Sequence, residues 1–341
     1  MLINEKGELN MQERETGELL DFKEFCLEVR NLLLMKFDKE CRVELNQVIK
    51  NNAIHLEGVV ILQKDETIAP NIYLNHYYVD YQNGSSFQDI MQGIIEAYYN
   101  AKVKGDIIAI TECLEFAKIK SFIIYRLINY NKNKKLLTDI PHTRFLDLAV
   151  TFHCLVKSSD DGIGTIRITN QHLKLWNATV EDLIHYAKTN TPVLFPPVVQ
   201  SMKKVIEKLM KEELSASYGE SLHSTEEMKN ITDRYYLENN NIEYNQEDTM
   251  LVVSNQRNIN GASCMIYSDL LKDIAEQLNA DLYILPSSIH EIIIVKNDYS
   301  YDKKILKDMV KDVNLTQVPL EEVLSDNVYF YSRSRLAITQ L

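Results

Sequence analysis

The stretch FLDLAVTFHCLV at residues 145–156 decides the fold class, together with the turn DGIG at 161–164 and the run TIRIT at 165–169. Two runs of β-branched and aromatic residues around a glycine-containing turn predict a pair of neighbouring strands. The sequence then changes to helical periodicity, with amphipathic helices expected at about 170–176, 180–189 and 197–213. This order of elements predicts a β-β-α unit.

The ends of the helix at 180–189 have their own signals. Thr179 suits the position before a helix, and Asp182 lies three residues later, which makes an imperfect capping box. Asn190-Thr191-Pro192 is expected to end the helix, because proline lacks the N–H that a helix interior needs.

The same order of elements returns towards the C-terminus. Strands are expected at 250–254 and 262–267 around a turn at 256–261, and Ser268 is expected to cap a helix at about 269–279. Further elements are a strand at 282–285, a strand at 291–295, a helix near 302–312 and a strand at 327–331. The two β-β-α units are compatible with a diverged internal duplication, but they share no motif.

The N-terminal part adds an amphipathic helix at 18–37, a β-hairpin and a second helix at 86–102. The hairpin joins strands at 42–48 and 55–62 around Asn51-Asn52. Together these elements predict an α+β fold, with mixed sheets built from β-β-α units and helices packed on the sheet faces.

An acidic segment marks the expected domain boundary. Residues 211–248 hold ten Asp or Glu against three Lys or Arg, which is typical of an exposed linker or long loop. The expected organisation is a polar lead-in at 1–17, an α+β domain at 18–213, a linker at 214–248 and a second α+β domain at 249–341.

Composition excludes several classes of protein. The formal net charge of -12 disfavours a protein built mainly to coat nucleic acid or anionic lipid. No segment has the ~20 apolar residues of a membrane span, and the charged N-terminus does not resemble a signal peptide. The five cysteines form no C-x-x-C pair, so neither a disulfide framework nor a zinc site is indicated. A cytoplasmic location is therefore expected.

Four segments together resemble a known family. They are IAPNIYLN at 68–75, LINYNKN at 127–133, Pro141-His142 with LDLA at 146–149, and LPSSIHE at 285–291. In this order they are similar to a bacterial domain-of-unknown-function family (number 5688) met mainly in Firmicutes, over about residues 20–335. The later half has a more distant likeness to domain of unknown function 1444. Neither family has an established activity, so the resemblance implies an architecture and no chemistry.

The segment LPSSIHE has the residue types of a hydrolase site. Ser287 and Ser288 offer a nucleophile, His290 a base and Glu291 an orienting carboxylate. The structural alternative is a Pro-Ser-Ser turn whose hydroxyls bond to backbone groups. A strand at 291–295 would point His290 and Glu291 to opposite faces, and no G-x-S-x-G elbow is present. Ile294 occupies the second-histidine position of H-E-x-x-H, so a zincin site is excluded.

A second group of candidates is His142, Asp147 and His153, which are metal-ligand types within twelve residues. On a strand, Asp147 and His153 would share a face, with His142 in the preceding turn. Ordinary hydrogen-bonded polar residues are the alternative, and no metal or cofactor is predicted. A carboxylate in an apolar strand needs a partner, for which Arg144 or Arg126 is expected.

A basic stretch forms the third candidate. It contains six cations with no acid among them, interleaved with aromatic residues, as in some nucleic-acid or phosphate sites. The six are Lys118, Lys120, Arg126, Lys132, Lys134 and Lys135. The alternative is a solvated basic face over aromatic residues of the core. No G-x-G-x-x-G and no P-loop is present.

No complete catalytic constellation emerges, so the leading hypothesis is a non-catalytic intracellular protein that binds a protein or small-molecule partner. The alternative is a hydrolase whose site assembles around His142, Asp147, Ser287 and His290. For that alternative, His290 or His142 must lie within hydrogen-bond reach of a serine or carboxylate in a cleft. Nucleic-acid binding through residues 118–135 is a third hypothesis.

Overall fold

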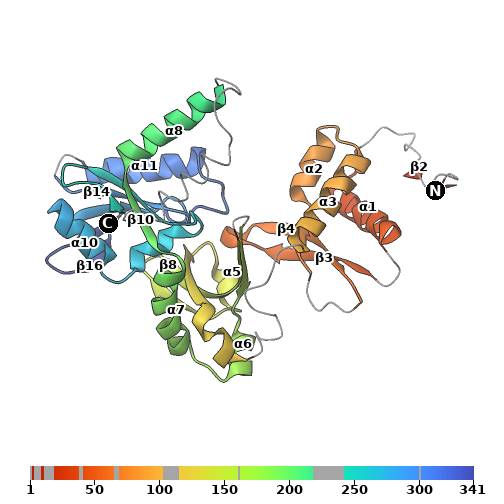
Figure 1. Ribbon diagram of the computed structural model, residues 1–341, viewed down its shortest axis with the longest axis horizontal. Coiled ribbons are helices and arrows are strands. Elements are labelled where there is room, and N and C mark those ends of the chain that lie inside the picture. The colour runs from red at the N-terminus through yellow and green to blue at the C-terminus, as the bar shows by residue number, and fades with distance from the viewer. Residues whose placement is uncertain are drawn as a thin grey trace. The chain divides into compact units, whose positions relative to one another are not determined.

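The structure is a computed structural model that describes residues 2–3, 9–10, 19–37, 41–64, 69–102, 115–159, 162–217, 242–298 and 301–341. Its antiparallel and mixed sheets with helices make an α+β protein, which confirms the predicted fold class (Figure 1). None of the helices within the described ranges is long and apolar enough to cross a membrane. The chain forms two compact units, one of Met1–Lys50 with His55–Gly105, the other of Asn51–Ile54 with Asp106–Leu341.

Unit 1 has a three-stranded antiparallel sheet packed with helices. β3 (Arg42–Ile49) pairs with β4 (His55–Leu62), and β4 pairs with β5 (Asn71–Tyr73). The helices are α1 (Phe22–Lys36), α2 (Asn75–Gln82) and α3 (Phe87–Lys102), and a separate two-stranded ribbon joins β1 (Leu2–Ile3) to β2 (Leu9–Asn10). The predicted hairpin and the predicted helices at 18–37 and 86–102 are confirmed, and Asp21 with Glu24 forms the capping box of α1.

The first sheet of unit 2 is organised around the long strand β8 (Leu148–Ser159). This strand pairs antiparallel with β6 (Ile123–Asn129), β7 (His142–Phe145) and β9 (Gly162–Arg167). The prediction of one strand at 145–156 is wrong, because a tight turn at Leu146-Asp147 separates β7 from β8. Leu146 has a φ of 56° there, and the apolar pattern runs through the turn without marking it.

The second sheet of unit 2 has seven strands in the order β11-β10-β12-β14-β13-β15-β16. All neighbours are antiparallel except β10 and β11. The strands are β10 (Pro197–Ser201), β11 (Ile242–Glu243), β12 (Met250–Asn255), β13 (Leu282–Leu285), β14 (Ile292–Lys296), β15 (Tyr329–Ser332) and β16 (Ala337–Gln340).

This sheet unites strands from both sides of the acidic segment. β10 lies before residues 214–248, yet it pairs with β12 after them. Most of the segment, residues 218–241, lies outside the described residues. One division between the compact units lies between Gly105 and Asp106, and Asn51–Ile54 also belongs to unit 2. The predicted domain boundary at the acidic segment stays a prediction.

The helices of unit 2 correct three predictions. The expected strand at 262–267 is the 3₁₀ helix η4 (Gly261–Ile266), so the second unit is not β-turn-β-helix. The expected helix at 197–213 divides into β10 and α8 (Met202–Ser217). α7 (Val180–Leu194) continues past Pro192, because Thr191 is buried against β6, where its hydroxyl accepts from Tyr125 N at 3.1 Å. The Thr179–Asp182 capping box is confirmed.

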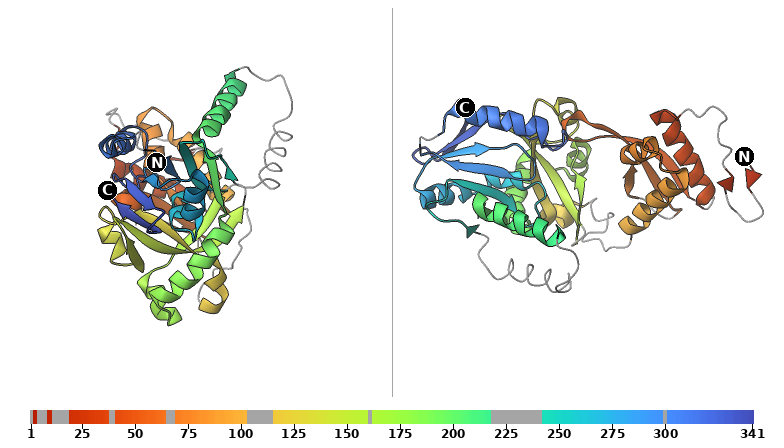
Figure 2. Two further views of the ribbon diagram at one scale, coloured as in Figure 1. Left: turned by 90° about the vertical axis from the view of Figure 1, so that its left-hand side faces the viewer. Right: turned by 90° about the horizontal axis from the view of Figure 1, so that it is seen from above.

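The remaining helices are α4 (Phe116–Ile119), η3 (Lys120–Phe122), α5 (Lys134–Leu137), α6 (Asn170–Trp176), α10 (Leu270–Leu278) and α11 (Lys303–Thr316). α10 is preceded by Asp269 rather than capped by Ser268. The main core of unit 2 draws on β6, β8, α7, η4, α10 and the central strands of the large sheet. α11 packs along the strands through Leu306 and Val310 in a second cluster (Figures 1 and 2).

Candidate functional site

The turn between β13 and β14 carries the residues that the sequence singled out. β14 begins only at Ile292, so His290 and Glu291 precede the strand, and both line one open groove. The condition under which they would point to opposite faces, a strand that includes Glu291, is therefore not met. Backbone bonds join the turn to the segment before β15, from Ile289 N to Glu322 O at 2.8 Å and from Leu324 N to Ser287 O at 3.0 Å.

The groove has a volume of about 420 Å³ and lies in unit 2. One wall is the turn at 288–291, and the other is the loop at 317–322. Its lining residues are Asn258, Ser288, His290, Glu291, Gln317, Val318, Pro319 and Glu322.

The His290 ring has partners at both nitrogens. Its Nε2 lies 3.4 Å from Glu322 Oε1. Its Nδ1 lies 3.2 Å from Asn258 O and 3.4 Å from Asn260 N. With a proton on Nε2 directed at Glu322, Nδ1 accepts from Asn260 N–H. The histidine thus lies within reach of a carboxylate in a cleft, which is the geometry that the hydrolase alternative required.

Ser288 and Glu291 complete this wall. Ser288 is buried, and its Oγ accepts from His290 N at 3.0 Å, which confirms the predicted turn with a hydroxyl bonded to backbone. Burial raises the pKa of the Glu291 carboxyl above its usual 4.5, and the charge of Glu322 adds to the rise. A side-chain hydrogen bond from Ser288 and the nearby His290 act in the opposite direction and lower the pKa. The groove therefore places two carboxyl groups close enough to interact.

A close backbone approach sets the position of the turn. Ser254 Oγ donates to His290 O at 2.8 Å, and Ala262 N donates to Ile289 O at 3.1 Å. A Cβ on Gly261 would lie 2.4 Å from His290 O and 2.1 Å from Ser254 Oγ, so only glycine fits between them.

An asparagine network holds the opposite wall. Asn52 Nδ2 donates to Leu320 O at 2.8 Å and to Val323 O at 2.7 Å. Asn133 Nδ2 donates to Asn52 Oδ1 at 3.1 Å, and Asn133 Oδ1 accepts from Asn52 N at 2.8 Å. Asn129, in the same LINYNKN segment, donates to Leu324 O at 3.0 Å. These asparagines thus position the loop that carries Glu322, and their part is structural.

Asp147 is buried with partners that differ from those predicted. Its carboxylate accepts from Ser325 Oγ at 2.7 Å, Asn327 Nδ2 at 2.9 Å and Tyr329 Oη at 2.5 Å. The expectation of Arg144 or Arg126 is wrong, because Arg144 Nε donates to Leu146 O and Arg126 Nη2 to Thr165 Oγ1. Burial, and then the Asp147 charge, raise the pKa of Tyr329 above its ordinary value. Asp147 ties the β7–β8 turn to the segment before β15.

The two histidines of that group have separate partners. His142 begins β7 instead of lying in a turn, and its Nδ1 faces Ile140 O at 3.0 Å. His153 is buried, with Nε2 at 3.3 Å from Thr151 Oγ1. Throughout the described ranges, no three His, Cys, Asp or Glu residues come together as a metal site would need. No contact in those ranges joins His142, Asp147 or Ser287 to His290.

The six basic candidates lie in different surroundings. Lys118 pairs with Glu115 at 2.9 Å, and Lys132 lies 3.7 Å from Asp326. Lys120 Nζ lies 5.8 Å from the centre of the Tyr186 ring, and α5 presents Lys134 and Lys135 exposed. Arg126 is partly buried in β6, and its Nη2 donates to Thr165 Oγ1. Nucleic-acid binding through this segment stays a prediction.

Glu322, Asn258 and Gln317 line the groove, and sequence reasoning missed all three. They lie between 27 and 32 residues from His290, outside any local motif, so no spacing in the sequence links them to it. The only local hint is Glu321-Glu322, which follows Pro319 in a polar stretch.

Fold and site together define an α+β protein with a polar groove between a strand-to-strand turn and the loop after α11. The model of the family of unknown function DUF5688 matches residues 22–333, so the chain belongs to this family. No curated protein and no solved structure matches the chain.

Proposed function

We propose that the protein is a non-catalytic binding protein whose groove takes a small ligand with a cationic group, an ammonium or a guanidinium. The observation that carries this proposal is the pair of carboxyl groups, Glu291 on the turn and Glu322 on the loop, one on each wall of the groove.

The size of the groove suits a small molecule. Its volume of about 420 Å³ lies within the roughly 300–1,000 Å³ that is usual for ligand sites. The lining is more polar than in most such sites, which favours a ligand recognised through hydrogen bonds and charge.

The chemistry of the groove favours a positive charge. A cation beside Glu291 compensates the burial that disfavours its ionised form. Ammonium and guanidinium groups are rich in donors, and they form charge-assisted bonds with carboxylates. The side chains of Asn258 and Gln317 supply amide oxygens as further acceptors.

The same contacts favour binding over hydrolysis. A general base needs a ring nitrogen directed at the proton that it removes. Both nitrogens of His290 are directed at protein groups, and the buried Ser288 hydroxyl is bonded to the His290 backbone. The side chains of Ser288 and His290 are held by protein contacts, as in a binding site, and they are not arranged as a nucleophile and its general base.

A cytoplasmic location in a bacterial cell belongs to this proposal. Its support is that Cys26, Cys41 and Cys264 form no disulfide within the described residues, because unpaired thiols persist in a reducing compartment.

Calorimetric titration of the full chain with butylamine, methylguanidine and arginine methyl ester tests the proposal, with acetate and butyrate as anionic controls. We expect at least one cationic compound to bind, and Glu322→Gln and Glu291→Gln each to weaken its affinity about fivefold or more. Glu321→Gln is the matched control, because Glu321 is the exposed neighbour of Glu322 and does not line the groove. Binding that both groove variants leave unchanged, or no binding of any cation, refutes the proposal.

A further inference from the structure

Arg126 is a partly buried cation of unit 2, and it does not line the groove. It lies in the middle of β6, and its Nη2 donates to Thr165 Oγ1 of β9 at 3.0 Å. Within the part of the chain that the structure describes, no carboxylate forms an ion pair with it. A guanidinium removed from water needs a compensating negative charge.

The neighbours of Arg126 add to the positive charge. His153 of β8 pairs in register with Arg167 of β9, on the sheet face that Arg126 shares. Burial, and secondly the charge of Arg167, lower the pKa of Arg126 to about 10. Burial and both arginines lower the pKa of His153 well below 6.5, which keeps its imidazole neutral. This face therefore carries positive charge that an anion would stabilise.

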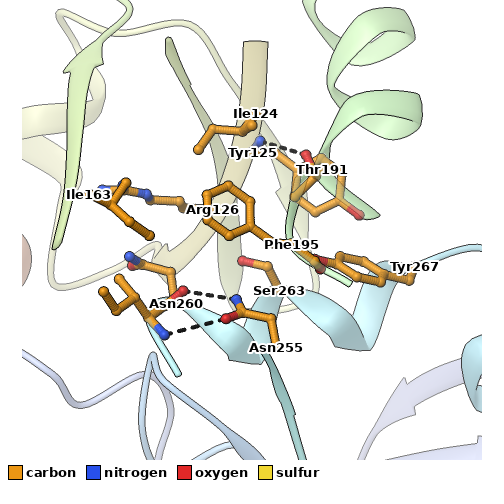
Figure 3. A pocket seen from close by; sticks show the side chains of 11 residues that line it. Ile124, Tyr125, Arg126, Ile163, Thr191, Phe195, Asn255, Asn260, Ser263 and Tyr267 are labelled. Carbon is orange, nitrogen blue, oxygen red and sulfur yellow. Dashed lines mark hydrogen bonds between the residues drawn. The ribbon is translucent and has the colours of Figure 1, made fainter. Parts of the chain in front are cut away.

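A small cavity lies beside Arg126. It has about 10 Å³ of free space, which is room for one ion or molecule of about the size of water. The lining combines apolar walls with polar groups from β6, β12 and η4 (Figure 3). The residues are Ile124, Tyr125, Arg126, Ile163, Thr191, Phe195, Asn255, Ile259, Asn260, Ser263 and Tyr267.

Two hydroxyl groups of this lining have no hydrogen-bond partner among the residues that the structure describes. Ser263 is only 3% exposed, and its Oγ has no hydrogen-bond partner among the described residues. Tyr125 Oη is likewise buried and without a partner in those ranges. Buried hydroxyls in native proteins almost always form hydrogen bonds. In the described ranges, the Ser263 hydroxyl has no hydrogen-bond partner and Arg126 has no carboxylate partner, which together favour a ligand in this cavity.

We propose that this cavity is a binding site for one halide ion, held by Arg126 and Ser263. A water molecule would satisfy the Ser263 hydroxyl but leave the positive charge uncompensated. Phosphate and sulfonate heads carry three or more oxygens around a central atom, and they exceed the free space.

Thermal unfolding at constant ionic strength tests the site on the full chain, with Trp176 fluorescence as the signal. Trp176 is the single tryptophan and belongs to unit 2. Isethionate, whose sulfonate head is too large, is replaced stepwise by chloride, formate or phosphate. A ligand that binds only the folded state raises Tm with the logarithm of its concentration above Kd, and constant ionic strength removes general screening.

Three variants locate the effect. Arg126→Met removes the charge and is expected to abolish the anion-dependent rise in Tm. Ser263→Ala keeps the arginine and the fold, and it is expected to weaken the anion affinity threefold or more. Arg144→Met is the matched control, because Arg144 is an exposed arginine of the same unit that does not line the cavity.

The three replacement anions test which anion the cavity takes. Stabilisation by chloride supports the halide site, and stabilisation by formate alone overturns it. Stabilisation by phosphate alone overturns the size assignment. No anion effect, or the same effect in the wild type, Ser263→Ala and Arg126→Met, overturns the proposal. If Arg126→Met does not fold, the comparison of Ser263→Ala with Arg144→Met decides it.

Discussion

Replacing Asp147 tests whether its buried carboxylate ties the β7–β8 turn to the segment before β15. Oδ2 accepts from Ser325 and Asn327, and Oδ1 accepts from Tyr329. Asp147→Asn preserves the shape of the side chain but removes its charge. The amide has one acceptor oxygen, so the bonds from Ser325 and Asn327 change from a charged acceptor, worth about 1.5–3 kcal/mol, to a neutral one, worth about 0.5–1.5 kcal/mol. Its NH2 group then faces Tyr329 Oη, whose hydroxyl loses its acceptor.

The loss summed over three bonds is about 3 kcal/mol. The variant no longer buries a charge, and this gain offsets part of the loss in hydrogen bonding. We therefore expect Asp147→Asn to lower the free energy of unfolding by about 2 kcal/mol. For a unit of this size, that corresponds to a fall in Tm of roughly 4–8 °C. Asp147→Ala leaves three donors without an acceptor and should cost more, because an unsatisfied buried donor costs about 1–3 kcal/mol.

Urea unfolding followed by Trp176 fluorescence measures this loss in unit 2 alone, since unit 1 contains no tryptophan. Asp308→Asn is the control, an exposed carboxylate on α11. The expected order of stability is wild type, Asp147→Asn, then Asp147→Ala. An Asp147→Asn variant within about 0.5 kcal/mol of the wild type refutes the reasoning, because changes of that size are usual for exposed sites.

Two further predictions concern the groove. Gly261→Ala places a Cβ 2.4 Å from His290 O. We therefore expect the free energy of unfolding in urea to fall by about 1–3 kcal/mol and the NMR signal of the His290 ring to shift. An unchanged ring signal contradicts the close approach. The pKa of Glu291 is raised in the folded state, so its contribution to stability is fully present below 4.5 and is lost as pH rises through the raised pKa. Glu291→Gln lacks this titration. In urea unfolding, the free energy of unfolding of the wild type should therefore fall relative to that of the variant between pH 4 and pH 7. A difference between the two proteins that does not change with pH would contradict the burial of Glu291.

Local patterns in the sequence predicted the elements whose stability is local. The amphipathic periodicity of residues 22–36 and the Thr179–Asp182 box involve contacts within one or two helical turns. The hairpin around Asn51-Asn52 also depends on neighbours in sequence, and all three predictions are confirmed.

Elements whose partners are distant in sequence were predicted less well. The run at 262–267 is mostly apolar and largely lies in η4, because a nearly fully buried segment shows no periodicity to separate strand from helix. β10 was predicted as helix, although its pairing with β12, more than fifty residues later, makes it a strand. Pairing of that kind depends on tertiary packing, which overrides local propensity.

The sequence by itself determined the fold class, the family and the turn at LPSSIHE, because composition, periodicity and short motifs are properties of neighbouring residues. Only the tertiary structure decided that His290 faces Glu322, that Asp147 is held by Ser325, Asn327 and Tyr329, and that Arg126 and Ser263 line one small cavity. The partners in each of these sets lie from 32 to 182 residues apart in the chain. Charge and hydrogen bonding act through space, so the folded chain selects those partners, and the spacing of residues along the sequence does not reveal them.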